Sequence, residues 1–292
     1  MNPTPSKSKA AMWMAGWLSL MLVTAIAGRE AGRELNVFDI MEIRCVLGLI
    51  LLYPLVHLAG GFASLRTARF RIHAARGLTH YMAQLGWFYA LTVIPLGQVI
   101  SLEFTMPIWT AIFAASFLGE RMTLWKVIAI VLGLIGVIMI VRPATDQVNP
   151  GQMIAATAAI GFGAAVVLMK SLTRTETAVT IVFWMMVVQL AAGAIPTAYV
   201  WTWPSPHIWL WLLAVSIGGT FSHFCLARAM RYADATIVVP MDFLRVPLSA
   251  AAGWLLYAER MDMLTISGAV LILSGNLLNL KAPAPRPTPV EA

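Results

Sequence analysis

Long apolar runs recur along the whole chain, and they constrain its fold more than any other feature. Sixty per cent of the 292 residues are hydrophobic and 11% are charged, whereas an ordinary soluble domain has about 25% charged residues. The runs are about 20 residues long, which is the length that an α-helix needs to cross the hydrocarbon core of a bilayer. Alternating runs of about 10 residues, typical of a membrane β-barrel, do not recur. The sequence therefore predicts a helical integral membrane protein.

Ten such segments can be distinguished, and each has about the length of a membrane-spanning helix. They cover residues 11–28, 38–59, 73–94, 96–118, 123–141, 151–170, 178–200, 207–230, 235–257 and 263–280. The first segment also contains Ala-Ile-Ala at 25–27, which is typical of a signal-peptidase site. It is long for a signal peptide, so we expect a helix there. The prediction is an all-α membrane protein with ten transmembrane helices.

Two similar stretches divide the chain into halves. Leu-Glu-Phe-Thr-Met-Pro at 102–107 leads to Gly-Glu-Arg-Met at 119–122, and Met-Asp-Phe-Leu-Arg-Val-Pro at 241–247 leads to Ala-Glu-Arg-Met at 258–261. Glu103 and Asp242 are 139 positions apart, which is close to half of the chain. The predicted organisation is a disordered N-terminus at 1–10, a five-helix repeat at 11–145, a second at 146–281, and a disordered Pro-rich tail at 282–292.

The charged loops indicate how the chain lies in the membrane. With the N-terminus inside, most lysines and arginines of the loops fall on the inner side. The outer side then holds only Arg29, Arg33, Arg142 and Arg260. Because positive charge favours the cytoplasmic side, we expect a bacterial inner-membrane protein with both termini in the cytoplasm. Each half has an odd number of helices, so the second half is inverted relative to the first. The sequence predicts two inverted-topology repeats.

Several functional classes are disfavoured. The net charge of +7 is not gathered in a basic stripe, so nucleic acid is not an expected partner. No P-loop, Gly-x-Ser-x-Gly or His-Glu-x-x-His motif is present, so neither an enzyme nor an ATP-driven pump is indicated. Cys45 and Cys225 lie in apolar runs without partners at metal-ligand spacing. We therefore expect no cofactor and no metal.

Charged residues inside apolar segments are the first candidates for a functional site. A charge at the bilayer centre costs at least about 2.5–3.5 kcal/mol, so such residues need a reason to be there. Glu103 lies in the fourth segment, and Asp242 and Arg245 lie in the ninth at a spacing that places them on one helix face. Either they face the transport pathway and bind a zwitterion or carry a proton, or they form a structural pair between packed helices.

Polar and aromatic residues gather on the third segment. His80, Gln84 and Phe88 share one helix face, with Tyr81 beside them. Such a stripe is typical of an aqueous cavity that holds a flat side chain, whereas any single aromatic taken alone favours core packing or contact with lipid. Further candidates for substrate binding are Trp17, Phe104, Phe162, Trp184 and His223.

Matching prolines suggest moving parts. Pro107 and Pro247 occupy equivalent places in the two halves, and proline removes a backbone hydrogen bond from a helix. Matching interruptions of this kind point to a transport site, although a static kink is the alternative. Glu120 and Glu259 close the two repeated stretches. They are predicted as gate residues, with a solvated helix cap as the alternative.

Together, these features resemble the EamA-type members of the drug/metabolite transporter superfamily. The resemblance rests on the two five-segment halves, on the Pro-then-Gly-Glu-Arg stretch ending at Arg121, on its echo near Glu259, and on Arg44 in the second segment. Ala258 departs from the pattern, because it replaces a glycine. Within the superfamily, the size and aromatic content are most similar to bacterial aromatic amino-acid exporters. The resemblance implies export through a central cavity lined by helices one, three, four, six, eight and nine.

The sequence thus predicts a secondary transporter that exports small amphipathic metabolites, most of all amino acids including aromatic ones, by alternating access. Its expected partners are a small-molecule substrate and the lipid bilayer, and one monomer suffices because it contains both halves. Coupling to protons is left open. The alternatives are a multidrug or metabolite carrier of the same fold, working in either direction, a membrane-embedded enzyme that uses Glu103 with Asp242, and a structural membrane protein.

Overall fold

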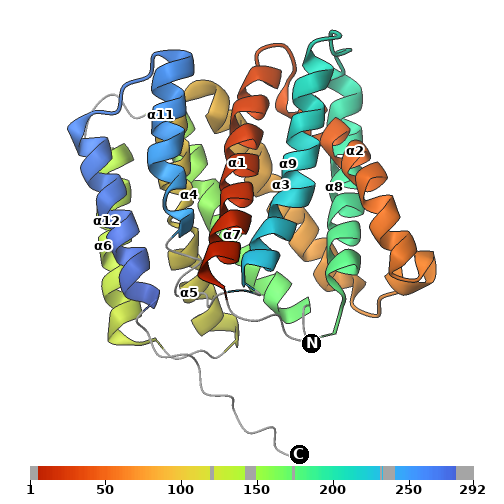
Figure 1. Cartoon of the computed structure of the whole chain (residues 1–292), viewed down its shortest axis with the longest axis horizontal. Coiled ribbons are helices and arrows are strands. Elements are labelled where there is room, and N and C mark those ends of the chain that lie inside the picture. The colour runs from red at the N-terminus through yellow and green to blue at the C-terminus, as the bar shows by residue number, and fades with distance from the viewer. Residues whose placement is uncertain are drawn as a thin grey trace, which may run out of the picture.

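The computed structural model describes residues 6–118, 122–141, 149–172, 175–230, 232 and 241–280, and within these ranges all regular structure is helical. The long helices alternate in direction along the chain, and α4 and α5 follow one another in the same direction (Figure 1). They are α1 (Lys7–Ala31), α2 (Val37–Leu58), the 3-10 helix η1 (Gly61–Leu65), α3 (Phe70–Val93), α4 (Leu96–Glu103), α5 (Met106–Leu118), α6 (Leu124–Val141), α7 (Pro150–Leu172), α8 (Ala178–Val200), α9 (Ile208–Met230), α11 (Arg245–Tyr257) and α12 (Met263–Leu280).

The described part of the chain contains helices that could span a membrane, as the sequence predicts. Six helices there are long and apolar enough to cross a bilayer. Most observed bounds lie within a few residues of the predicted segments, because the short loops carry clear capping residues. The side chain of Asn36, for example, accepts hydrogen bonds from the backbone N–H groups of Phe38 and Asp39 at the start of α2. Part of the predicted segment 235–257 lies outside the described residues.

The predicted segment 96–118 is present as a candidate span over Leu96–Phe117, but its helix is interrupted at Phe104 and Thr105, which divide it into α4 and α5. Pro107 has no N–H group to donate to the carbonyl four residues earlier, which belongs to Glu103. At the same break the backbone N–H of Ile108 donates to Thr105 rather than to Phe104, and the amide nitrogen of Asn276 on α12 donates to the carbonyl of Phe104 at 2.7 Å. The second half repeats the break, since turn residues 243 and 244 separate helical residues 241–242 from α11. Pro247 follows Phe243, the first of these turn residues, by four positions, so it cannot donate a backbone hydrogen bond to the Phe243 carbonyl.

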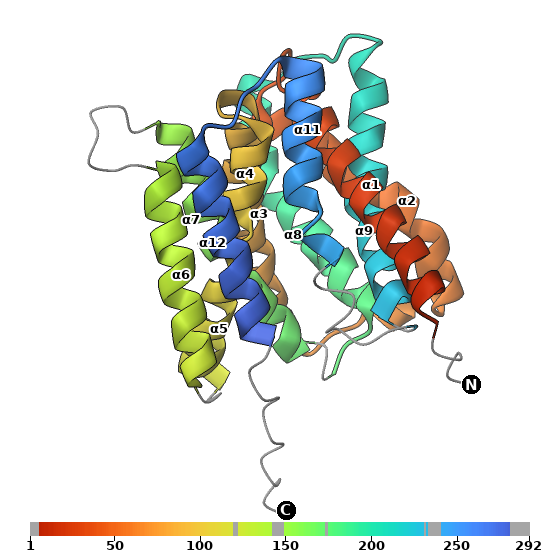
Figure 2. The same cartoon turned by 60° about the vertical axis from the view of Figure 1, so that its left-hand side comes forward.

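Long-range packing joins each half to the other. Helix α1 packs along α9, α3 along α7, α2 along α8, and α6 along α12. The α6–α12 pair stands side by side at one edge of the molecule, whereas α1, α2, α8 and α9 lie toward the other (Figures 1 and 2). The main buried core runs between these groups, around α3, α4 and α11.

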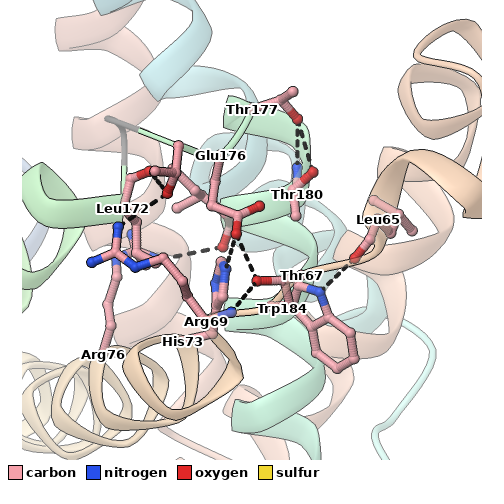
Figure 3. Close-up of polar contacts among 12 residues, drawn as sticks. Leu65, Thr67, Arg69, His73, Arg76, Leu172, Glu176, Thr177, Thr180 and Trp184 are labelled. Atoms are coloured by element: carbon pink, nitrogen blue, oxygen red, sulfur yellow. Dashed lines mark hydrogen bonds and ion pairs between the residues drawn. The ribbon is translucent and has the colours of Figure 1, made fainter.

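One end of the molecule is tied by a polar joint between the α2–α3 and α7–α8 connections (Figure 3). The Thr67 hydroxyl donates to Glu176 at 2.6 Å, and the guanidinium of Arg69 donates to the backbone and side chain of Ser171 at 2.7 and 2.6 Å. The indole N–H of Trp184 donates to the carbonyl of Leu65 at 2.9 Å. These bonds fix the two loops to each other.

The backbones of α6 and α12 approach each other so closely that no side chain fits between them at two glycines. A Cβ atom on Gly136 would lie 2.6 Å from the carbonyl oxygen of Gly268, and a Cβ atom on Gly268 would lie 2.7 Å from that of Gly136. Because a backbone oxygen cannot rotate aside like a flexible side chain, only glycine fits at either position. Small residues commonly permit such close approach between membrane helices.

We therefore expect Gly268→Val to lower the free energy of unfolding in detergent by about 1–3 kcal/mol, the usual effect of overpacking. The matched control is Val270→Leu on the same helix, where the side chain is 55% exposed. Thermal unfolding of the purified protein measures both. Equal melting temperatures for Gly268→Val and the wild type would contradict the close backbone contact.

Candidate functional site

Three charged side chains meet where the two interrupted helices face each other. The guanidinium of Arg245, at the start of α11, contacts the Glu103 carboxylate at the end of α4, with Nη2 to Oε1 at 3.0 Å. Its Nε atom lies 3.4 Å from Oδ1 of Asp242. The helix breaks bring these residues together, because they place the last turn of α4 beside the first turn of α11. We call Glu103, Asp242 and Arg245 the charged triad.

Two tryptophans hold the carboxylates of the charged triad. The indole N–H of Trp17 on α1 donates to Oδ1 of Asp242 at 2.5 Å, and that of Trp87 on α3 donates to Oε2 of Glu103 at 2.8 Å. An indole N–H is a donor only, so each tryptophan orients a carboxylate oxygen. The site is therefore assembled from α1, α3, α4 and α11 and from residues far apart in the chain.

Aromatic rings enclose the same charges. The rings of Phe104 and Phe243, which occupy matching positions in the two halves, meet edge to face with centroids 5.5 Å apart. The guanidinium carbon of Arg245 lies 4.9 Å from the centroid of Phe104 and 5.9 Å from that of Trp17. Cation–π contacts at these distances favour the charged form of arginine. The site thus combines ionic groups with flat apolar faces.

The electrostatics of the charged triad are unbalanced. Arg245 is only 4% exposed, so its charge needs compensation by close partners. Both carboxylates supply it, which leaves the ionised triad with a net charge of −1. In a low-dielectric interior this excess of negative charge favours the approach of a cationic group of a bound molecule. The triad is chemically suited to bind a cationic or zwitterionic solute.

A second polar cluster lies between α2, α3 and α8. Nη2 of Arg44 donates to the side-chain oxygens of Gln84 at 2.9 Å and of Gln189 at 2.6 Å. Gln189 also lies 3.0 Å from Nδ1 of His80, whose ring meets Phe162 edge to face at 5.3 Å. The predicted stripe on the third segment is therefore turned inward, where His80 and Gln84 both contact Gln189 and Gln84 also accepts from Arg44.

A joint at the upper end in Figure 1 connects α1, α4 and α11. The Glu259 carboxylate, just after α11, pairs with Arg29 on α1 and accepts the backbone N–H of Leu96, the first residue of α4, at 2.9 Å. The Arg29 guanidinium also stacks on Tyr257, 4.4 Å from the ring centroid. Beside this joint, rather than at the charged triad, is a cavity of about 640 Å³ lined by Arg29, Arg33 and Tyr257 among others.

The predicted site residues separate into groups. The structure gathers Trp17, Glu103, Phe104, Asp242 and Arg245 around the charged triad, and His80, Gln84 and Phe162 around Arg44.

The other predicted residues lie elsewhere. Tyr81 and Phe88 are fully buried, Phe88 against Trp87. Trp184 belongs to the polar joint between the α2–α3 and α7–α8 connections, and its indole N–H donates to the carbonyl of Leu65. Glu120 and the side chain of His223 lie outside the described residues.

Sequence reasoning assigned no role to Trp87, Phe243 or Gln189. Phe243 could have been found, because it is the repeat mate of Phe104. Trp87 and Gln189 gain their roles from helix packing, which leaves no local sequence signal.

Comparison with known proteins agrees with this architecture. The EamA-like transporter family matches twice, over residues 9–142 and 149–281. An S-adenosylmethionine uptake transporter of Rickettsia felis is 28% identical over 90% of both chains. A riboflavin transporter of Brucella anthropi is 30% identical over 80% of this chain and 84% of that one. A pseudopaline exporter of Pseudomonas aeruginosa is 29% identical over 84% and 86% of the two chains.

These relatives are named for S-adenosylmethionine, riboflavin and pseudopaline, and not for aromatic amino acids. A solved crystal structure, 20% identical, has a TM-score of 0.63 and covers 94% of this chain and 97% of its own, which shows the same fold. The double family match spans nearly the whole chain and agrees with its two similar halves. The chain belongs to the EamA-like transporter family of membrane transporters.

Proposed function

We propose that this protein is a secondary transporter for small metabolites that carry an amino-acid headgroup and a planar ring. The observation that carries the proposal is the charged triad, in which a buried arginine lies between two carboxylates at matching interruptions of the two halves. Interrupted helices in corresponding places are typical of transporter substrate sites. A structural ion pair would be expected to be balanced, whereas this triad has one negative charge in excess.

The chemistry of the triad fits both ends of a zwitterionic headgroup. The α-ammonium group of a substrate would contact Glu103 or Asp242, and its carboxylate would contact the guanidinium of Arg245, which binds carboxylates in a bidentate manner. Trp17 and Trp87 already orient the two acidic side chains. The rings of Phe104 and Phe243 would cover a planar group.

S-adenosylmethionine has this combination of groups. It carries an amino-acid headgroup, a planar adenine and a sulfonium charge, so its net charge of +1 complements the excess negative charge of the triad. Aromatic amino acids share the headgroup and a ring, and they remain candidates on the same grounds. Riboflavin has a planar ring system but no amino-acid headgroup, so we expect it to bind more weakly.

The packing of the helices supports alternating access between inverted halves. The packed pairs are related by exchange of the two halves. The first helix of one half packs on the third helix of the other, which gives both α1–α9 and α3–α7. The second helices of the two halves pack together as α2–α8, and the last helices as α6–α12. This is the pattern expected of a pseudo-two-fold axis in the membrane plane. The ends of α5 and α11 also point to opposite ends of the molecule (Figure 1). The proposal covers flux in either direction, because the relatives include both uptake and export proteins by name.

The distribution of charge supports an inner-membrane location with both termini cytoplasmic. The end of the molecule with the Arg69 joint holds most of the loop arginines and would face the cytoplasm. The Glu259 joint would then be at the outer surface. Glu259 connects the end of α11 to the end of α1, through Arg29, and to the start of α4, through Leu96. We therefore propose that Glu259 closes the outer side of the pathway.

The first test is counterflow in liposomes that contain the purified protein. Vesicles are preloaded with unlabelled S-adenosylmethionine, phenylalanine or riboflavin, and uptake of the matching labelled compound is followed. We expect accelerated uptake for S-adenosylmethionine or phenylalanine, because both offer a headgroup to the triad. Counterflow with riboflavin alone would contradict the role of the triad in headgroup recognition. Absence of counterflow with every compound, from folded protein, would reject the substrate class.

The second test removes one charge of the triad. We expect Glu103→Gln to reduce the counterflow rate about 10–100-fold, because a hydrogen bond to a charged group contributes about 1.5–3 kcal/mol. Trp87→Phe should cause a smaller loss, because it removes only the donor that orients Glu103. Glu34→Gln is the control, since Glu34 accepts the Ser205 hydroxyl in the loop before α9, away from both the charged triad and the Glu259 joint. Wild-type flux in Glu103→Gln would remove this residue from the mechanism.

The third test concerns the Glu259 joint. We expect Glu259→Gln to weaken its contacts with Arg29 and the start of α4, so that the outer side opens more often. A cysteine at Ala250, which packs against Gly97 on α4, should then react several-fold faster with a membrane-impermeant maleimide. Native Cys45 and Cys225 are buried, which keeps background labelling low. Unchanged labelling would identify Glu259 as a static helix cap.

A further inference from the structure

Glu42 on α2 is an acidic residue that the charged triad does not use and that has no partner among the described residues. Its Oε2 atom is buried without a hydrogen bond, and no ion pair to it is formed within the described part of the chain. Asp39, one turn earlier, also has a buried oxygen without a hydrogen bond, Oδ1, but its other carboxylate oxygen is bound twice. Its Oδ2 atom accepts the side-chain amide of Asn36 at 2.8 Å and the backbone N–H of Thr202 at 3.3 Å.

Tyr81 on α3 faces Glu42 and is equally without a partner. Its side chain is 97% buried, and its hydroxyl makes no hydrogen bond with the described residues. Both oxygens lie over Gly193 of α8. A Cβ atom at this position would lie 2.9 Å from the Tyr81 hydroxyl and would collide with Oε2 of Glu42. The glycine therefore leaves room for the two oxygen atoms to approach each other.

The surrounding charges do not neutralise Glu42. On its own helix are Asp39, Arg44 and Cys45, and Arg44 directs Nη2 to Gln84 and Gln189. On α3, His80 lies against Gln189. Helix α8 contains no Asp, Glu, His, Lys or Arg, and α9 approaches Arg44 through Gly219. The side chain of His223 on α9 lies outside the described residues.

An ionised carboxylate without a cation or a hydrogen bond is unfavourable in a membrane interior, and a proton removes the charge. The protonated group gains a donor, and the Tyr81 hydroxyl is an acceptor across Gly193. We propose that Glu42 is the proton-carrying site of the transport cycle and that Tyr81 is its hydrogen-bond partner. This inference rests on the proposed transport function, and it separates proton transfer at Glu42 from substrate binding at the charged triad.

The proton balance of this step is simple. Glu42 takes up one proton from the water on one side, and its O–H then donates to the Tyr81 oxygen. After the change of conformation the proton leaves to the water on the other side. The Tyr81 hydroxyl then donates to the carboxylate, and it keeps its own proton throughout. One proton crosses in each cycle, and no other group is oxidised, reduced or modified.

The experiment compares exchange with net transport in the same proteoliposomes. Labelled S-adenosylmethionine is the probe, with labelled phenylalanine in parallel, and a pH-sensitive dye reports proton movement. In the wild type we expect counterflow at equal pH and, in addition, accumulation driven by a pH gradient. In Glu42→Gln we expect counterflow within about threefold of the wild type, whereas gradient-driven accumulation and substrate-linked proton movement fall at least tenfold.

Two further variants keep the test decisive. Asp39→Asn, on the same helix and with its partners retained, should keep both activities. Tyr81→Phe should keep counterflow and reduce gradient-driven accumulation, and it provides the answer if Glu42→Gln is poorly folded by thermal unfolding.

The outcomes separate the two proposals. Absence of wild-type counterflow would reject the transport function itself. Wild-type counterflow without any response to the pH gradient would overturn only the role of Glu42. Loss of both activities in folded Glu42→Gln and Tyr81→Phe would assign these residues to substrate binding instead. Accumulation driven by a sodium gradient, and lost in Glu42→Gln, would replace the proton by a metal cation and overturn the proposal.

Discussion

The buried position of Arg245 is the constraint on which the centre of this molecule depends. A guanidinium that is 4% exposed cannot be left without partners in a membrane protein, so Glu103 and Asp242 must both reach it. They do so because α4 ends at Glu103 and α11 begins at Arg245, and those limits follow from prolines that interrupt the helices. The tryptophans that hold the carboxylates then fix α1 and α3 against the same point.

The two polar clusters in the interior, around Arg245 and around Arg44, differ in the charge of the groups that surround the arginine. Around Arg245 the acidic groups exceed the basic one and aromatic rings cover them, so the cluster attracts a cationic or zwitterionic solute. Around Arg44 the partners are neutral amides, which hydrogen-bond the guanidinium without cancelling its charge. Glu42 lies on the same helix as Arg44 but is not paired with it among the described residues. An interior arranged in this way offers separate places for a solute and for a proton.

Much of the fold could be predicted from the sequence, because helix length and loop composition are local properties. Intramembrane charge is also a strong signal, and it led to Glu103, Asp242 and Arg245 before their contacts were known. The contact between Asp242 and Arg245 was expected from their spacing and is present, but the tryptophan partners of the two carboxylates could not be predicted. Trp17 lies 225 positions from Asp242, and only the packing of α1 beside α11 brings its indole to the carboxylate. The interruption near Pro107 was expected, but its position after Glu103 was not, since the missing proline N–H acts on a carbonyl four residues earlier.

The α6–α12 contact has a consequence for how the protein is made. Helix α6 closes the first half, and its glycine face fits only the last helix of the chain. Helices α1, α2 and α3 likewise find their main neighbours in the second half. Because the first-half helices are synthesised before these partners, their native packing can form only after the partner helices, α12 among them, have been made.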